Sequence, residues 1–278
     1  MTLNGIVLAI IGMLILSFSK LTARKAMHAN NVLTAAMWIH VIIAATVGVL
    51  AIIFGDFAIP RDIPYYLLTV LIGAIAIVPL YVAYQLQGLG LPTAIASAFA
   101  PITVLLSVLF AAERFSFLVW IGMIFVFSGV FLTSADLRNW HRPKLQKGLG
   151  WAFITMLGWG AYFFLIKKVV DEMGVWPATF ALETGVATCI IIFALFRKAV
   201  TLPKEMKWII FTGTLDGIGV LCYYAALQFI SISIAATILQ VSLVVCAVLA
   251  ALFLKERFTT LQKMAILMTF VGLVMVTV

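Results

Sequence analysis

Charged residues are scarce in this sequence. Asp, Glu, Lys and Arg together make up 10% of its 278 residues, whereas a soluble domain carries roughly a quarter. Hydrophobic residues make up 65%, and the mean hydropathy is +1.21. So few charges do not cover a surface that faces water. We therefore predict that lipid surrounds most of the chain and that the bilayer is one of its partners.

The residues that metal and redox chemistry require are also few. The three cysteines lie inside apolar segments at irregular spacing, which fits neither a disulfide framework nor a metal site. The three histidines are far apart, and we find no His-Glu-x-x-His, no Gly-x-Ser-x-Gly and no phosphate-binding glycine loop. We expect no cofactor, no metal and no enzymatic activity. A membrane-embedded enzyme, a channel and a structural or receptor role are the alternatives.

Apolar segments long enough to span a bilayer recur along the chain. A spanning helix needs ~20 apolar residues. The expected spans are 3–23, 32–54, 64–86, 90–112, 115–134, 148–170, 176–196, 206–228, 231–254 and 260–278. Pro79 and Pro101 interrupt the third and fourth of these and are expected to kink them. The predicted fold class is an all-α membrane protein with ten transmembrane helices, located in the cell (inner) membrane and expected to be a monomer.

The second half of the chain repeats the first at one constant shift. Glu113-Arg114-Phe115 recurs as Glu256-Arg257-Phe258, and the same shift, here called the repeat offset, brings Tyr81 onto Tyr224. This periodicity indicates a diverged tandem duplication. We predict a first five-helix repeat over 1–137, a polar linker over 138–147 and a second five-helix repeat over 148–278. Because five is odd, the second repeat enters the membrane from the opposite side, which gives the inverted repeats typical of secondary transporters.

The lysines and arginines gather at one set of connections. The net charge is +8, and most of the 18 basic residues fall near the predicted loops 1–2, 5–6, 7–8 and 9–10. In short membrane loops such residues set topology, so we expect no nucleic-acid partner. The positive-inside rule puts these loops in the cytoplasm and both termini outside.

These features are similar to those of a known family. Two five-helix repeats, the turns Glu113-Arg114-Phe115 and Glu256-Arg257-Phe258, and the segment 217–227 resemble the EamA-type transporters of the drug/metabolite transporter superfamily. The resemblance covers essentially the whole chain. It implies a monomer that moves small organic solutes by alternating access, with both termini often drawn in the cytoplasm.

Ionisable residues inside apolar segments are the first candidates for a transport site. Asp216 lies near the middle of the eighth span, where a carboxylate costs at least ~2.5–3.5 kcal/mol and usually faces an interior cavity. Glu183 in the seventh span falls on His40 in the second, so the pseudo-symmetry places the two around one cavity. We hypothesise that this pair, or Glu183 with Asp216, binds a driving proton or a cationic substrate group. The alternatives are a protonated structural acid bonded to a neighbouring helix for Asp216, and an interfacial or hydrogen-bonded histidine for His40.

Lys20 lies late in the first predicted span. We expect it to snorkel to the interface, and contact with a substrate carboxylate is the alternative. The turns with Glu113 and Glu256 are expected to be structural, with the acid at the start of the helix that follows.

Aromatic and amide side chains complete the candidate site. Aromatic faces near a buried acid attract ammonium groups, and Gln240 is a polar group at membrane depth. The remaining candidates for substrate binding are Trp38, Tyr81, Tyr84, Trp159, Tyr162, Tyr223 and Gln240. The expected substrate is a small amine-bearing metabolite such as an amino acid or amine, moved by a proton-linked or gradient-driven carrier. A quaternary ammonium compound such as choline is the alternative.

Overall fold

The protein is a bundle of helices. The computed structural model describes residues 3–55, 58–87, 95–134, 146–254 and 259–277. The helices of the first half are α1 (Leu3–Ala29), α2 (Val32–Phe54), α3 (Ile63–Gln87), the 3-10 helix η1 (Ser97–Phe99), α5 (Ala100–Phe110) and α6 (Phe117–Ser134). The helices of the second half are α7 (Gln146–Met173), α8 (Val175–Phe196), α9 (Met206–Ala226), α10 (Ile232–Gln240), α11 (Ser242–Leu254) and α12 (Thr260–Thr277).

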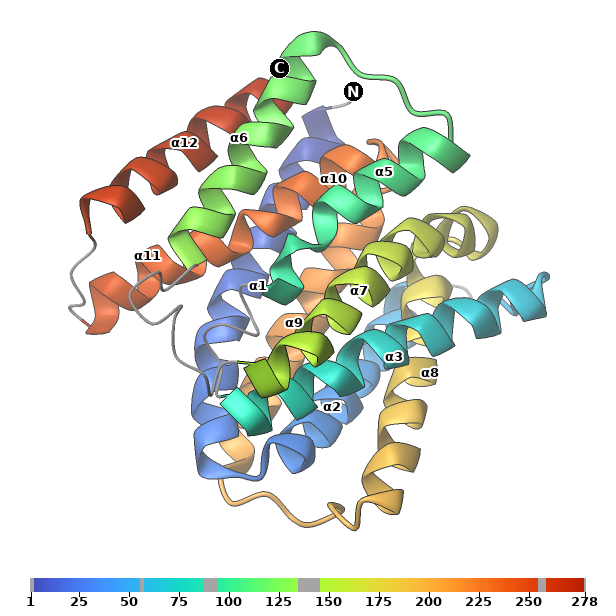
Figure 1. Ribbon diagram of the computed structural model, residues 1–278. Helices are drawn as coiled ribbons and strands as arrows, with labels where there is room; N and C mark the ends of the chain where they lie inside the picture. Colours follow the sequence, from blue (N-terminus) through green and yellow to red (C-terminus); the bar gives the residue numbers. More distant parts are fainter. Residues whose placement is uncertain (1–2, 56–57, 88–94, 135–145, 255–258, 278) are drawn as a thin grey trace.

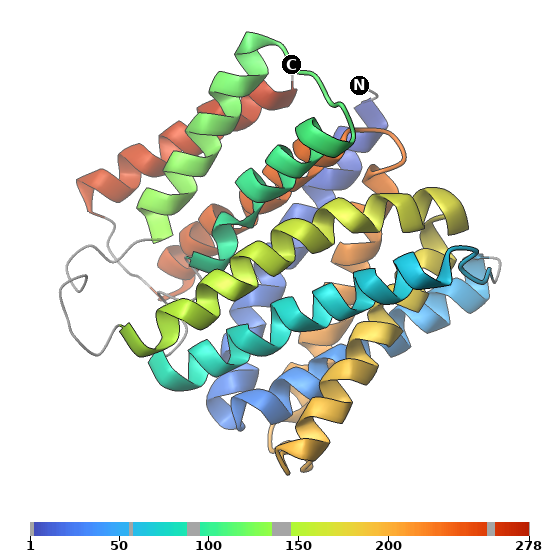
Figure 2. The ribbon, with the colours of Figure 1, turned by 45° about the vertical axis from the view of Figure 1, so that its right-hand side comes forward.

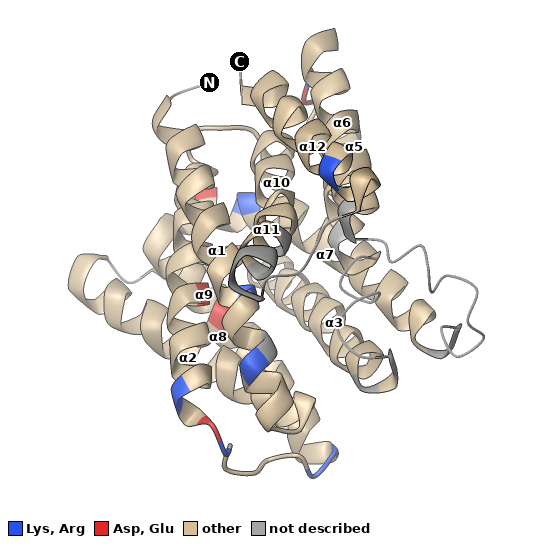
Figure 3. Cartoon of the chain, turned by 90° about the vertical axis from the view of Figure 1, so that its left-hand side faces the viewer, with Lys and Arg blue, Asp and Glu red and all other residues tan. Residues whose placement is uncertain are grey.

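The length and composition of the helices suit a bilayer. Seven of them are long and apolar enough to cross it, and α5, α6 and the α10–α11 pair are shorter apolar elements. Figure 3 shows that charged residues are sparse along the helices. The predicted all-α membrane fold is therefore confirmed. The predicted linker over 138–147 lies almost entirely outside the described residues.

The two halves pack as inverted copies of each other. α1 lies antiparallel to α9, since Gly5 approaches Phe229 while Thr22 reaches Thr212. The repeat offset relates this pair to α7 with α3, which run side by side in Figures 1 and 2. The repeat offset relates α2 to α8 and α6 to α12, and the two helices of each of these pairs pack against each other. The predicted inverted repeat thus accounts for the main helix contacts.

The fourth and ninth helices of the predicted set are not continuous. The expected span 231–254 is broken at Val241, between α10 and α11. The repeat offset places Val241 on Ala98, which departs from helical geometry (φ −75°, ψ 25°) inside η1. Residues 88–94 of the expected span 90–112 lie outside the described residues. Both repeats therefore depart from a regular α-helix at the same position of the same helix, although Val241 itself keeps α-helical backbone angles.

Candidate functional site

A chain of hydroxyl groups ends on a buried acid in the middle of the bundle. Tyr162 of α7 and Tyr224 of α9 join their hydroxyl oxygens at 2.8 Å, and the Tyr224 hydroxyl donates to Glu183 Oε1 of α8 at 3.3 Å. All three side chains are buried. Three helices from the second repeat thus hold one buried carboxyl group, which accepts a hydrogen bond from Tyr224.

Aromatic rings extend this cluster toward the broken fourth helix. Phe99 stacks on Phe163 with ring centroids 4.6 Å apart, and it meets Trp159 edge-on at 6.0 Å. Phe163 also contacts Tyr223 at 5.4 Å. The hydroxyl of Tyr223 is buried without a hydrogen-bond partner among the described residues. Trp159, Tyr162 and Tyr223, predicted as site residues, therefore lie in one cluster.

Asp216 faces α1. Its carboxylate lies within electrostatic range of Lys20 and beside Ser19, whose hydroxyl oxygen is buried but does not reach hydrogen-bond geometry. Lys20 does not snorkel to the interface. Its Nζ donates to Ser242 Oγ at 2.5 Å, at the first residue of α11. The expectation of an interfacial Lys20 was wrong because α1 continues to Ala29, so this residue lies deeper than a span ending at 23 implies.

The other predicted residues occupy three separate places. His40 is buried in α2, with Nδ1 2.9 Å from Ala36 O, and its ring meets Tyr81 edge-on at 6.3 Å. Tyr84 lies next to Tyr81 at 6.2 Å. Gln240 is buried at the end of α10, and its Oε1 has no partner among the described residues. Trp38 points elsewhere, since its Nε1 donates to Thr201 O in the α8–α9 connection at 2.9 Å.

A small cavity of about 130 Å³ reaches Tyr81 from one end of the bundle. Its lining includes Asn31 of the α1–α2 connection, Tyr81 of α3 and Arg197 after α8. The α1–α2 and α8–α9 connections lie together at this end, because Asn30 Oδ1 accepts the Lys204 backbone N–H at 2.6 Å. These are two of the connections that the charge pattern predicts on one face of the membrane.

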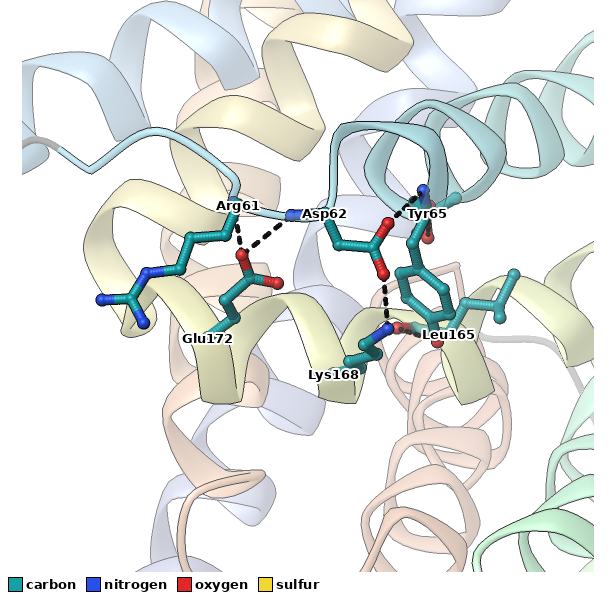
Figure 4. A network of polar contacts seen from close by, with 7 residues as sticks. Arg61, Asp62, Tyr65, Leu165, Lys168 and Glu172 are labelled. Atoms are coloured by element: carbon teal, nitrogen blue, oxygen red, sulfur yellow. Dashed lines mark hydrogen bonds and ion pairs between the residues drawn. The ribbon is translucent and has the colours of Figure 1, made fainter.

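A polar network fixes the opposite end of the bundle (Figure 4). Glu172 of α7 accepts the backbone N–H groups of Arg61 and Asp62, and Lys168 donates to Asp62 Oδ2 at 2.7 Å. Lys168 Nζ also lies 4.1 Å from the Tyr65 ring centroid. The hydrogen bond from Lys168 lowers the pKa of the exposed Asp62 carboxyl below its usual value. This network joins the α2–α3 connection to α7.

The cation–π contact in this network has an equivalent elsewhere in the bundle, related to it by the repeat offset. The repeat offset relates Lys25 to Lys168 and Tyr65 to Trp208. Lys25 Nζ lies 4.1 Å from the Trp208 ring centroid. The same contact therefore ties α1 to α9 and α7 to α3, which is independent support for the inverted repeat.

The Glu113 turn has a different role from the one predicted. Its carboxylate accepts the backbone N–H of Ile232 at 2.9 Å and of Ser233 at 3.3 Å, and it also accepts the Ser233 hydroxyl. Glu113 thus caps α10 of the other repeat, and not α6, the helix that follows it. The acid satisfies free N–H groups at the positive end of a helix dipole. The equivalent Glu256 lies outside the described residues.

Sequence reasoning did not identify three of the residues at this site. Phe99, Phe163 and Ser242 are ordinary members of apolar runs, and only their proximity to the helix breaks sets them apart. Within the described ranges, no group of three His, Cys, Asp or Glu side chains converges as a metal site.

Comparison with known proteins agrees with this arrangement. A model of the EamA-like transporter family matches residues 3–135 and again residues 146–278. A solved structure described only as "Crystal structure of protein" superposes with a TM-score of 0.82, over 99% of this chain and 98% of its own, at 14% identity. At this identity the likeness concerns the fold alone. No curated protein matches the chain.

Proposed function

The chain belongs to the EamA-like transporter family, and from this membership we propose that it carries a small amine-bearing metabolite, such as an amino acid or amine, by alternating access. Members of this family are multi-pass membrane proteins that transport small solutes, and this chain is one of them. Proton linkage and the class of solute are the proposed refinements. We further propose that it works as a monomer in the cell (inner) membrane.

The buried Glu183 carries this proposal. A carboxyl group that is removed from water and bonded to the Tyr224 hydroxyl exchanges a proton at modest cost, and it also attracts an ammonium group. Asp216 adds a second acid at membrane depth, within electrostatic range of Glu183. Two acids among tyrosine rings suit a cationic group of the solute and a proton.

Transport measured in proteoliposomes at several pH values tests this assignment. We expect uptake of an amino acid or amine by the wild-type protein to vary with pH, and we expect Glu183→Gln to remove most of that variation. Asp171→Asn is the matched control, because Asp171 is an exposed acid paired with Lys167 on α7. If Glu183→Gln retains both the pH dependence and the affinity of the wild type, Glu183 has no part in the mechanism.

A carrier of quaternary ammonium compounds such as choline is the second candidate. The observation that favours it is the group of buried rings around Glu183, since tyrosine faces attract cations that have no N–H group. Competition between choline and amino acids for uptake separates the two candidates.

A further inference from the structure

Two equivalent pairs of charged residues lie at opposite ends of the bundle in different arrangements. The repeat offset relates Lys168 to Lys25 and Asp62 to Glu205. Lys168 Nζ lies 2.7 Å from Asp62 Oδ2. Within the described part of the chain, Lys25 and Glu205 form no ion pair, and Glu205 Oε2 instead lies 3.3 Å from Lys207 Nζ. One ion pair between the repeats is therefore formed, and its equivalent at the other end is not.

Other equivalent residues show the same difference between the two ends. Leu33 and Arg197 line the cavity at the α1–α2 and α8–α9 connections, here called the cavity end. The repeat offset relates them to Trp176 and Phe54. These two lie at the opposite end, here called the Glu172 end, where Glu172 binds the α2–α3 connection. The rings of Phe54 and Trp176 have their centroids 5.7 Å apart. Positions that line a cavity at one end are thus in contact at the other.

Lys25 lies beside the residue with which it could pair. Its Nζ is 4.1 Å from the Trp208 ring centroid, and Trp208 follows Glu205 by three residues at the start of α9. The equivalent lysine at the Glu172 end is at the same distance from its own ring, and it also reaches its acid. Both lysines therefore occupy the equivalent position, and the ion pair is what distinguishes the two ends.

We propose that these two ion pairs form alternately and act as the gates at the two ends of the carrier. In the conformation described, Lys168 and Asp62 hold the Glu172 end closed. In the opposite conformation Lys25 and Glu205 pair and the cavity end closes, while Lys168 and Asp62 separate. Inverted repeats move against each other between two conformations, so a contact at one end in the first is expected at the other end in the second. This inference rests on the proposed alternating access and not on the class of solute.

The two pairs affect the balance between the conformations although their side chains are largely exposed. An exposed ion pair contributes little to the stability of a fold. Each of these pairs is present in only one conformation, however, so its whole energy acts on the equilibrium between the two. Loss of one pair is therefore expected to change the ratio of the conformations by about two- to fivefold. Loss of the equivalent pair is expected to change the ratio in the opposite direction.

The substitutions Asp62→Asn and Glu205→Gln test the proposal, because each removes one charge and keeps the shape of the side chain. The reporters are single cysteines, Val82→Cys at the cavity and Ala225→Cys at the position that the repeat offset relates to it. The three native cysteines are replaced by alanine. The rate at which a charged maleimide labels each reporter, in the purified full-length chain in detergent, measures the exposure of the corresponding end.

The two substitutions are expected to have opposite effects. Asp62→Asn is expected to speed labelling of Ala225→Cys by about two- to fivefold and to slow labelling of Val82→Cys. Glu205→Gln is expected to slow labelling of Ala225→Cys by a similar factor, although Glu205 lies at the other end of α9. The variant with both substitutions is expected to label like the parent chain, because effects at distant sites add.

Asp171→Asn is the matched control. Asp171 pairs with Lys167 one turn away on the same helix, so this pair is expected in both conformations. The control is expected to leave both labelling rates unchanged. If the cysteine-free chain does not fold, hydrogen exchange of the same charge variants in the native chain, followed at residues 31–35 and 174–178, gives the same comparison between the two ends.

Two results would overturn the proposal. They are a change in the same direction with Asp62→Asn and Glu205→Gln, and no change at the end opposite to the substitution. The measurement needs no solute, so it is separate from the proposed substrate class. A chain that labels as expected but takes up no amino acid or amine retains the gates and loses that class, whereas a chain that takes them up but labels otherwise retains the carrier and loses the gates.

Discussion

At the scale of the residue, Tyr224 links the Tyr162 hydroxyl to the buried carboxyl group of Glu183. Its hydroxyl bonds to both Tyr162 and Glu183. The equivalent residue, Tyr81, meets His40, which the repeat offset relates to Glu183. Both repeats therefore bring this tyrosine to the same ionisable position, by a hydrogen bond to Glu183 in one case and by an edge-on ring contact with His40 in the other.

Tyr224→Phe tests the hydrogen bond to Glu183. Loss of the hydroxyl is expected to cost about 1 kcal/mol of stability. The substitution also removes a hydrogen-bond donor to the Glu183 carboxylate. The protonated form of Glu183 then becomes more stable relative to the anion, and the pH of half-maximal uptake rises. Uptake at graded pH and thermal melting in detergent measure the two effects.

Tyr66→Phe is the control for this variant. Tyr66 donates its hydroxyl to Ala181 O at 2.8 Å, so its loss removes a similar bond without contact to Glu183. We expect a similar fall in stability and an unmoved pH profile. A profile that moves equally in both variants, or in neither, contradicts the role assigned to Tyr224.

Some of these residues were within reach of sequence reasoning, and others were not. Glu183, His40 and Asp216 stand out because an ionisable residue inside an apolar run is rare. Lys20 was misplaced because the end of α1 could not be judged from hydropathy: the helix continues through polar residues to Ala29. The roles of Phe99 and Phe163 depend on contacts between distant segments, which apolar runs do not reveal.

At the scale of the element, glycines set how closely paired helices approach. Gly272 of α12 and Gly129 of α6 are equivalent in the two repeats, and both lie in the α6–α12 contact. A Cβ atom at Gly272 would lie 2.6 Å from Gly122 O and 2.8 Å from Phe125 Cβ. Small residues allow such backbone contact between membrane helices. The glycine in the last helix of each repeat thus serves packing.

Gly272→Ala is therefore expected to destabilise the protein. The added methyl group has to displace backbone atoms of α6, which typically costs about 1–3 kcal/mol. Gly150→Ala is the control, because nothing lies within 4 Å of a Cβ atom at that exposed position of α7. Thermal melting of both variants gives the comparison. Equal midpoints for the two variants would show that α6 and α12 do not pack as described.

The helix breaks show the limit of prediction at this scale. Pro101 lies in the first turn of α5 and gave a hint of the interruption near Ala98. The break at Val241 has no such signal, because the segment 231–254 is continuously apolar apart from a few small polar residues and Gln240. The Glu113 cap on α10 crosses from one repeat to the other, so a local pattern does not predict it.

At the scale of the whole molecule, the inverted repeat is the feature that the sequence predicts best. The matching Glu-Arg-Phe turns define the repeat offset, and this offset correctly relates the Lys25–Trp208 contact to the Lys168–Tyr65 contact. An inverted pair of halves has two equivalent conformations open to opposite sides, which is the basis of alternating access. The orientation in the membrane stays a prediction from the charge pattern.

The central claim is that one solute site is exposed in turn to each side of the membrane. Counterflow in proteoliposomes at equal internal and external pH tests it most directly. With an excess of unlabelled amino acid inside, a carrier is expected to accumulate labelled amino acid above its external concentration before the label declines to equilibrium. Entry of label that rises only to the external concentration, whatever solute is inside, would indicate a passive pore and would contradict alternating access.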